Sequence, residues 1–250
     1  MTCHAMQNFV WKYDGSMAVY PPDEHLLRDL QVCSEWANED ECSFTAPVTD
    51  PVRTTDGSMA LGPLFAVADL ALVSTAIGFA ESDWCGTLDL AVRTGEAVKD
   101  GPLVVACQVV RVGGTLVTTK AEILDGDRLA GTAIATSRRM PRNLEFNDAA
   151  PAQKQIGVPH RWGHEMSGFD QPVTTRLGLV EEAPGAVVLN KTSYVTNSFG
   201  TINGGATGIL LVAAAESALG HEFVAADIDA RYVGQAADGP VRTMLSLIHI

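Results

Sequence analysis

The sequence predicts an α+β protein in which one arrangement, a long apolar helix with an antiparallel sheet, occurs twice and is incomplete the second time. Two helical stretches that are apolar on almost every face each follow a pair of glycines spaced five residues apart. Segments with strand-like patterning, separated by short turns that contain glycine and aspartate, follow the first helix. The order strand, helix, strand then recurs later in the chain, which indicates an internal duplication.

Composition limits the class of protein. The chain has 250 residues, 46% of them hydrophobic, which is enough for a large buried core. The net charge of −13 argues against a nucleic-acid partner or a basic membrane-binding surface. No signal-peptide pattern opens the chain, and both apolar helices are shorter than the roughly 20 residues of a membrane span, so we expect a cytoplasmic protein. Five cysteines without C-x-x-C spacing predict reduced core thiols.

The first repeat is expected over residues 26–140. Residues 1–25 lack a clear period and form an N-terminal extension. A strand is predicted over 41–49, and an apolar helix from Leu64 to Phe79. The strands predicted after this helix span 87–94, 102–112, 115–124 and 128–137.

A proline-bearing linker is expected over residues 141–172, and a second repeat over 173–244. In this repeat we predict a strand over 185–196, a helix over 206–219, and strands over 226–233 and 239–244. Gly57 and Gly62 match glycines 143 positions later, at 200 and 205, and this offset places the two helices in register. Asp89 matches Asp229 at an offset of 140, so the loop lengths differ by a few residues.

The second repeat stops short of two of the strands that the first repeat contains. The last six residues, "LSLIHI" at 245–250, match the translation of a transposon-end adapter that is used in preparing sequencing libraries. We therefore expect a fragment that has lost its natural C-terminus; the alternative is a genuine apolar tail.

Asp69 is the notable polar residue of the first helix. An unpaired ionised carboxylate in an apolar interior is costly, so Asp69 must be hydrogen-bonded, protonated, or exposed to a cleft. A purely structural acid remains an alternative. The second helix carries Val212 at the matching position, and its acid, Glu216, comes one turn later.

Asn203, Gly204 and Gly205 begin the second helix. Backbone N–H groups at a helix start, with no side chains to block approach, favour a bound oxygen that carries negative charge. A simple turn is the alternative for a lone glycine pair.

Together these residues resemble the hotdog superfamily, and within it the phenylacetyl-CoA thioesterase branch. The signature of that branch, N-x-H-G-x-x-H-G-G followed by an acid, is split here between "NSFGTINGG" at 197–205 and "GPLFAVAD" at 62–69. Phe199 and Asn203 replace its two histidines. The resemblance covers roughly residues 26 to 244 and implies a double hotdog fold, in which each of two long helices is wrapped by an antiparallel sheet.

The resemblance implies a site shared between the repeats, because the family pairs two units about a two-fold axis. Asp69 would meet Asn197, Gly204 and Gly205, and would act either as a general base or as a nucleophile. Glu216 is the alternative acid. The residues expected to bind substrate are Asn203, Phe199, Phe65 and Ser74.

The implied activity is hydrolysis of an acyl-CoA thioester by an intramolecular pseudo-dimer, with further homo-oligomerisation left open. No cofactor is expected beyond the CoA of the substrate, and the sequence does not predict the acyl group. No metal is expected either, since His160 and His164 lie in the linker rather than on a helix. The alternatives are a non-catalytic acyl-CoA-binding hotdog protein and a hotdog hydratase or dehydratase.

Overall fold

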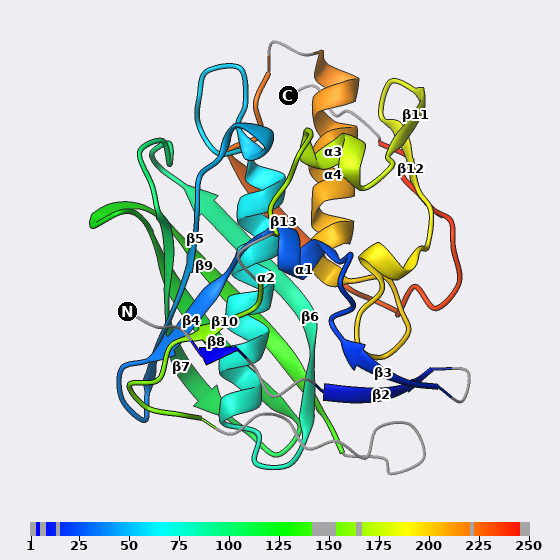
Figure 1. The fold of residues 1–250 in the computed structure, drawn as a ribbon. Helices are drawn as coiled ribbons and strands as arrows, with labels where there is room; N and C mark the ends of the chain where they lie inside the picture. Colours follow the sequence, from blue (N-terminus) through cyan, green and yellow to red (C-terminus); the bar gives the residue numbers. More distant parts are fainter. Residues whose placement is uncertain are drawn as a thin grey trace.

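The structure, a computed structural model, describes residues 4–5, 9–13, 16–141, 154–163, 167–220 and 223–245, with backbone alone before residue 20. Over these residues the chain is α+β, with a large antiparallel sheet and two long helices (Figure 1). The helices are α1 (Leu26–Asp29), α2 (Leu61–Gly78), α3 (Val173–Arg176) and α4 (Gly204–Leu219).

The largest described sheet has nine strands, and most neighbours in it are antiparallel. Its spatial order is β1 (His4–Ala5), β10 (His160–Arg161), β4 (Cys33–Trp36), β5 (Glu41–Ala46), β7 (Leu103–Val112), β8 (Leu116–Asp125), β9 (Arg128–Met140), β6 (Trp84–Thr94) and β13 (Asp227–Arg231). A smaller sheet contains β11 (Val180–Ala183), β12 (Ala186–Leu189) and β14 (Val241–Arg242), and a hairpin pairs β2 (Phe9–Tyr13) with β3 (Ser16–Tyr20).

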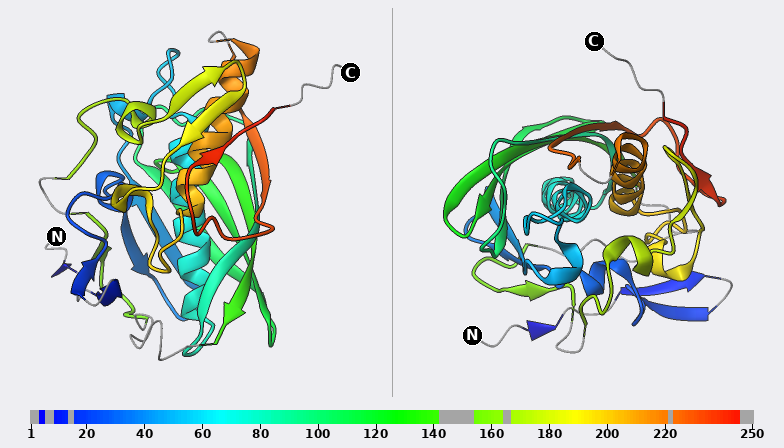
Figure 2. Two further views of the ribbon diagram at one scale, coloured as in Figure 1. Left: turned by 90° about the vertical axis from the view of Figure 1, so that its right-hand side faces the viewer. Right: turned by 90° about the horizontal axis from the view of Figure 1, so that it is seen from above.

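The large sheet curves around α2, as the view from above shows (Figure 2). This arrangement explains why α2 has no polar stripe: the sheet covers one side of the helix and α4 lies on another. By length and composition α2 could cross a membrane, but 78% of it is buried inside the fold, which is typical of a core helix.

Helices α2 and α4 lie side by side because small residues line their contact. A Cβ atom on Gly62 would lie 3.2 Å from Cα of Ile209, and one on Gly205 would lie 2.9 Å from Cα of Ala66. Side chains larger than glycine at these positions would therefore separate the helices.

The loops that precede the two helices have the same hydrogen-bond pattern. Thr54 donates its N–H to the carbonyl of Ser58, and Asn197, 143 positions after Thr54, donates its N–H to the carbonyl of Thr201. The N–H of Ala60 donates to the carbonyl of Val52, and the N–H of Asn203 donates to the carbonyl of Val195 in the same way. This correspondence supports the predicted repeat.

Several strand predictions differ from the structure. The strand predicted over 185–196 ends at Leu189, and the chain then forms a 3-10 turn over Ser193–Val195, closed by a hydrogen bond from Val195 to Thr192. Helix α4 begins at Gly204, two residues earlier than predicted. The N-terminal extension contains strands that its sequence pattern does not indicate.

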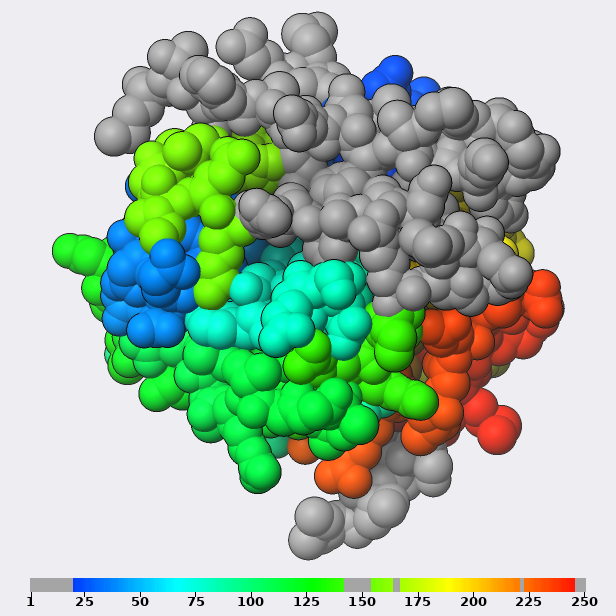
Figure 3. Space-filling view, turned by 90° about the horizontal axis from the view of Figure 1, so that it is seen from below, coloured from blue at the N-terminus to red at the C-terminus, as the bar shows by residue number. Residues whose placement is uncertain are grey.

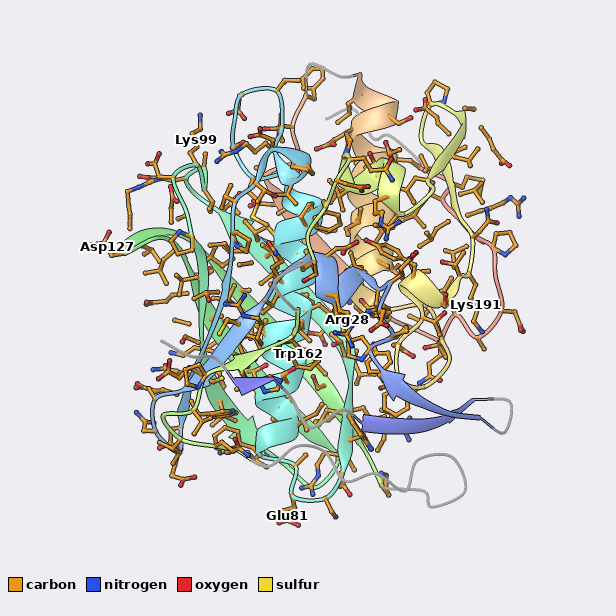
Figure 4. All side chains as sticks on the ribbon, in the orientation of Figure 1. Arg28, Glu81, Lys99, Asp127, Trp162 and Lys191 are labelled. Carbon is orange, nitrogen blue, oxygen red and sulfur yellow. The ribbon has the colours of Figure 1, made fainter. Side chains whose placement is uncertain are left out.

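Part of the predicted linker is described. Residues 154–157, at the start of this segment, lie next to the β4–β5 turn at the lower end of the molecule (Figure 3). Here the Lys154 ammonium donates to the carbonyl of Glu39 and stands 3.3 Å from the centre of the Phe79 ring. The segment continues to Trp162, which lies over the middle of the fold, whereas Glu81 marks the lower rim (Figure 4).

Cys42, Cys85 and Cys107 are buried free thiols. Cys3 and the end of the chain from residue 246 lie outside the described residues.

Candidate active site

Asp69 lies in the middle of α2 with an exposed fraction of 6%. The hydroxyl of Thr87 on β6 donates to its Oδ1 at 2.8 Å, and the backbone N–H of Gly205 on α4 lies near the carboxylate. Burial raises the pKa of Asp69 to about 6, while the Thr87 hydroxyl and the Gly205 N–H oppose the shift. Groups from both β6 and α4 therefore surround the acid.

Gly204 lies directly against this acid. A Cβ atom at position 204 would stand 2.7 Å from Oδ2 of Asp69 and 3.3 Å from the hydroxyl oxygen of Tyr232. Only glycine lets the first turn of α4 approach the carboxylate this closely. The structure thus brings together Asp69, Gly204 and Gly205.

Asn203 caps α4 with its side chain. Its Oδ1 accepts from the N–H of Gly205 at 2.8 Å and from that of Ala206 at 3.3 Å. Of the two amides that were expected to be open to a bound oxygen, those of Gly204 and Gly205, the Gly205 amide is therefore capped within the chain. The N–H of Gly204 has no hydrogen-bond partner among the residues that the structure describes.

Asn197 closes the loop before α4. Its side-chain amide donates to the hydroxyl of Thr201 at 2.8 Å, and its Oδ1 accepts from the N–H of Phe199 at 2.9 Å and from that of Thr201 at 3.0 Å. Both ends of this side chain are engaged within the loop, so in this geometry Asn197 shapes the loop before α4. The ring of Phe199 packs edge-on against Trp84, with 5.7 Å between ring centres.

The remaining predicted residues are farther from the acid or lie within the core. Phe65 has no exposed surface and fills the α2–α4 contact beside Gly208, so in this structure it packs between the helices. Ser74 is partly buried, five residues along α2 from Asp69, or about 7.5 Å along the axis.

Glu216 lies near the other end of α4, about 18 Å along the axis from Gly204. Its Oε1 accepts from the N–H of Ala225 at 3.2 Å, and burial raises its pKa. At the position that matches Asp69, α4 has Val212, which is buried. The matching start of α2 is capped by Ala60, which provides no side-chain hydrogen bond.

Two residues of this neighbourhood were missed in the sequence. Thr87 lies in a predicted strand whose alternation places it on the same face as Asp89, away from the core. A bulge between Thr87 and Asp89 reverses this and turns Thr87 inward. No sequence signal marks that bulge.

Tyr232 is the second missed residue, and it directly follows β13. Its hydroxyl donates to the carbonyl of Gly204 at 2.9 Å. Burial, and secondarily the charge of Asp69, raise the pKa of Tyr232 above its usual range, so the phenol is neutral. Tyr232 holds the first turn of α4 beside the acid.

Within the described ranges, no group of three or more His, Cys, Asp or Glu side chains is placed to hold a metal ion. His160 lies in β10 and packs edge-on against Trp162. His164 lies outside the described residues.

No protein-family model and no curated protein matches this chain. Among the solved structures similar to part of it are several described as thioesterases. A mutant thioesterase from Pseudomonas aeruginosa is 14% identical with a TM-score of 0.41, and the match covers 44% of this chain and 82% of that one. A thioesterase from Haemophilus influenzae is 19% identical with a TM-score of 0.38 (41% and 73% covered), and a mutant thioesterase from Staphylococcus aureus is 18% identical with a TM-score of 0.39 (42% and 88% covered).

Proposed function

We propose that the chain hydrolyses acyl-CoA thioesters at a single site shared between its two repeats. The observation that carries this proposal is the contact between the Asp69 carboxylate and the first turn of α4, where Gly204 lies against the acid and the nearby N–H of Gly205 favours its ionised form. The site combines an acid whose pKa lies near 6 with a helix N-terminus that favours negative charge on oxygen.

The proposed pseudo-dimer is supported by the pairing of β6 with β13. Leu90 stands opposite Ala230, and on either side Asp89 faces Arg231 and Ala91 faces Asp229. Because Asp89 and Asp229 are matching positions, this register is symmetric about its centre, as a two-fold axis requires.

The contacts between the helices exchange in the same way. Gly62 meets Ile209, and Gly205 meets Ala66, so each contact joins positions that match those of the other. This reciprocity explains how the acid of one repeat can serve the helix start of the other.

In the proposed reaction the thioester carbonyl oxygen faces the first turn of α4, where the Gly204 N–H and the helix dipole stabilise the charge that develops on it. Thr87 engages Oδ1 of Asp69 and leaves Oδ2 facing Gly204. Asp69 then either takes a proton from the attacking water or attacks the carbonyl carbon itself, which gives an acyl anhydride that water opens. In both routes the C–S bond breaks and CoA leaves as a thiol after protonation.

One observation favours a non-catalytic acyl-CoA-binding protein as the second candidate. Asn203 occupies the N–H groups of Gly205 and Ala206, and Asp69 has little exposed surface. Substrate must displace part of this arrangement before hydrolysis can occur.

The experiment is to measure thiol release from a panel of short, branched and aromatic acyl-CoAs with the unaltered chain and the Asp69→Asn variant. Hydrolysis that requires Asp69 supports the proposal. Tight acyl-CoA binding without thiol release by the unaltered chain supports the binding protein instead. The assay of thiol release uses purified protein. The cytoplasm is the proposed location of the protein.

A further inference from the structure

Ser137 on β9 is a buried hydroxyl beside the candidate site. It stands directly opposite Thr87 in the antiparallel pairing of β6 with β9, and its exposed fraction is 0%. Its Oγ has no hydrogen-bond partner among the described residues. Buried hydroxyls are rarely left in this state, because the lost hydration is not replaced.

Thr87 has a single hydroxyl hydrogen, which it donates to Oδ1 of Asp69. That arrangement suits an ionised acid and also an acid whose proton is on Oδ2, the oxygen that faces Gly204. Once Asp69 carries a proton on Oδ1, the acid becomes the donor and the oxygen of Thr87 must accept. The hydrogen of Thr87 then needs another acceptor.

Ser137 is placed to be that acceptor. Directly opposed residues of an antiparallel pair have Cβ atoms about 4.5–5.5 Å apart, a separation at which Ser and Thr hydroxyls form cross-strand hydrogen bonds. On its other side Ser137 pairs with Val117, which is fully buried and offers no polar side-chain atom.

We propose that Ser137 is a positioning residue that accepts the Thr87 hydrogen when Asp69 is protonated on Oδ1, and so stabilises that form of the acid. The inference deepens the proposed function and rests on it, since general-base hydrolysis leaves a proton on the Asp69 carboxyl group. In the ionised state Ser137 has no hydrogen-bond partner among the described residues; in the Oδ1-protonated state the three side chains form one chain of hydrogen bonds.

Among the described residues, few other groups near Asp69 can change its pKa, so the effect of Ser137 on that pKa can be measured. β6 contributes Thr87, α4 contributes the N–H of Gly205, and β13 is followed by Tyr232, which is the ionisable neighbour in the described structure. The adjacent Arg139 is engaged by Asp83 at 2.9 Å, and its charge is directed to that carboxylate.

The test is an NMR titration of the Asp69 carboxyl carbon in the full chain. Ser137→Ala should lower the Asp69 pKa by about half a unit to one unit, the equivalent of one net hydrogen bond. Ser137→Thr, which keeps the hydroxyl, should leave it near the original value. Thr87→Val should raise the pKa, because the ionised acid loses a donor. Adding Ser137→Ala to Thr87→Val should then change nothing further.

The matched control is Thr119→Val. Thr119 is also fully buried and inward-facing, but its hydroxyl donates to the carbonyl of Leu72 at 3.2 Å. This variant should melt at a lower temperature without moving the Asp69 pKa. Ser137→Ala should melt no lower than the unaltered chain when the pH is well above the pKa of Asp69, since only an unpartnered hydroxyl is removed.

An unchanged Asp69 pKa in Ser137→Ala would overturn the inference, as would an equal shift in the Thr87→Val background. These readouts need no turnover. Failure of the chain to hydrolyse any acyl-CoA would therefore count against the proposed function, and an unmoved pKa against the role of Ser137.

Discussion

The ring of Phe65 occupies the space in which a side chain at Gly208 would stand. A Cβ atom at position 208 would lie 2.1 Å from Cδ1 of Phe65. The two residues are 143 positions apart, the same separation as the matching glycines before the helices, so they are equivalent positions that meet each other. The ring of Phe65 fills the space that Gly208 leaves open. Two phenylalanine side chains could not both fit at this contact.

This contact predicts a strong effect of side-chain volume. Gly208→Ala should lower the free energy of unfolding by about 1–3 kcal/mol or more through overpacking, and Phe65→Ala by about 3–5 kcal/mol through the cavity it leaves. Urea unfolding measures both. The double variant Phe65→Ala/Gly208→Ala should lose less than the sum of the two, because the added methyl group enters the vacated space. Strict additivity would show that the two positions do not share this volume.

Asp69→Asn should lower kcat/KM for acyl-CoA hydrolysis by about 100-fold or more, the usual order for a positioned base or nucleophile. Val212→Ala and Glu216→Gln are the comparisons, because Val212 holds the matching position and Glu216 is the other acid of the helices. Steady-state thiol release measures all three. If Glu216→Gln were the damaging change, the acid assignment would move to the other repeat.

Gly204 and Gly205 should respond differently to alanine. At Gly204 the new methyl group meets the end of the Asp69 side chain, which can rotate away, so activity should fall about 10-fold to 100-fold with a small change in melting temperature. At Gly205 it meets the backbone of Ala66 at 2.9 Å, so stability itself should fall. Equal melting temperatures for the two variants would contradict the predicted difference.

Activity and stability should depend on pH in opposite directions through Asp69. Since the base must be ionised, kcat/KM should rise with pH through about 6. The pKa of Asp69 in the folded chain lies above the 3.8 of a free aspartate, so the contribution of Asp69 to stability is full below 3.8 and is lost as the pH rises through about 6. Chemical unfolding at a series of pH values should show a flatter profile over this window in Asp69→Asn. An identical profile in both proteins would contradict the raised pKa.

Tyr232→Phe should lower kcat about 10-fold with little change in KM, because the first turn of α4 loses the hydroxyl that holds it beside Asp69. Tyr194→Phe is the control, since Tyr194 is also a buried phenol but donates to Asp29 at 2.8 Å rather than to Gly204. That variant should lose stability and keep its kcat. Equal kcat losses in both would indicate a general structural effect.

The elements with strong periodic patterns were predictable from sequence. Helix α2 and strands β6 to β9 lie within a few residues of their predicted bounds, because long apolar or alternating segments leave few other structures. The shorter strands β4 and β11 and the 3-10 turn before α4 depend on tertiary contacts that the sequence does not display.

The contact between Asp69 and Gly204 follows the split signature, in which each half of the motif lies in a different repeat. The loop contacts of Asn197 were not predicted, because in sequence an asparagine that shapes a turn looks the same as one that binds substrate. Thr87 and Ser137 were missed because a bulge decides their direction and strand register decides their neighbours. Neither property can be read from one strand alone.

The pairing of β13 with β6 bears on how this protein folds. It joins Asp227 to Arg93 and Arg231 to Asp89, residues more than 130 positions apart. A contact of such sequence separation forms only after a long loop has closed, and the entropy of that closure slows folding. β6 through β9 can first assemble from neighbouring hairpins, so the addition of β13 is the late step. The acid and the helix start of the candidate site therefore meet only near the end of folding, and a chain that misses this step keeps a native-looking sheet with no complete site.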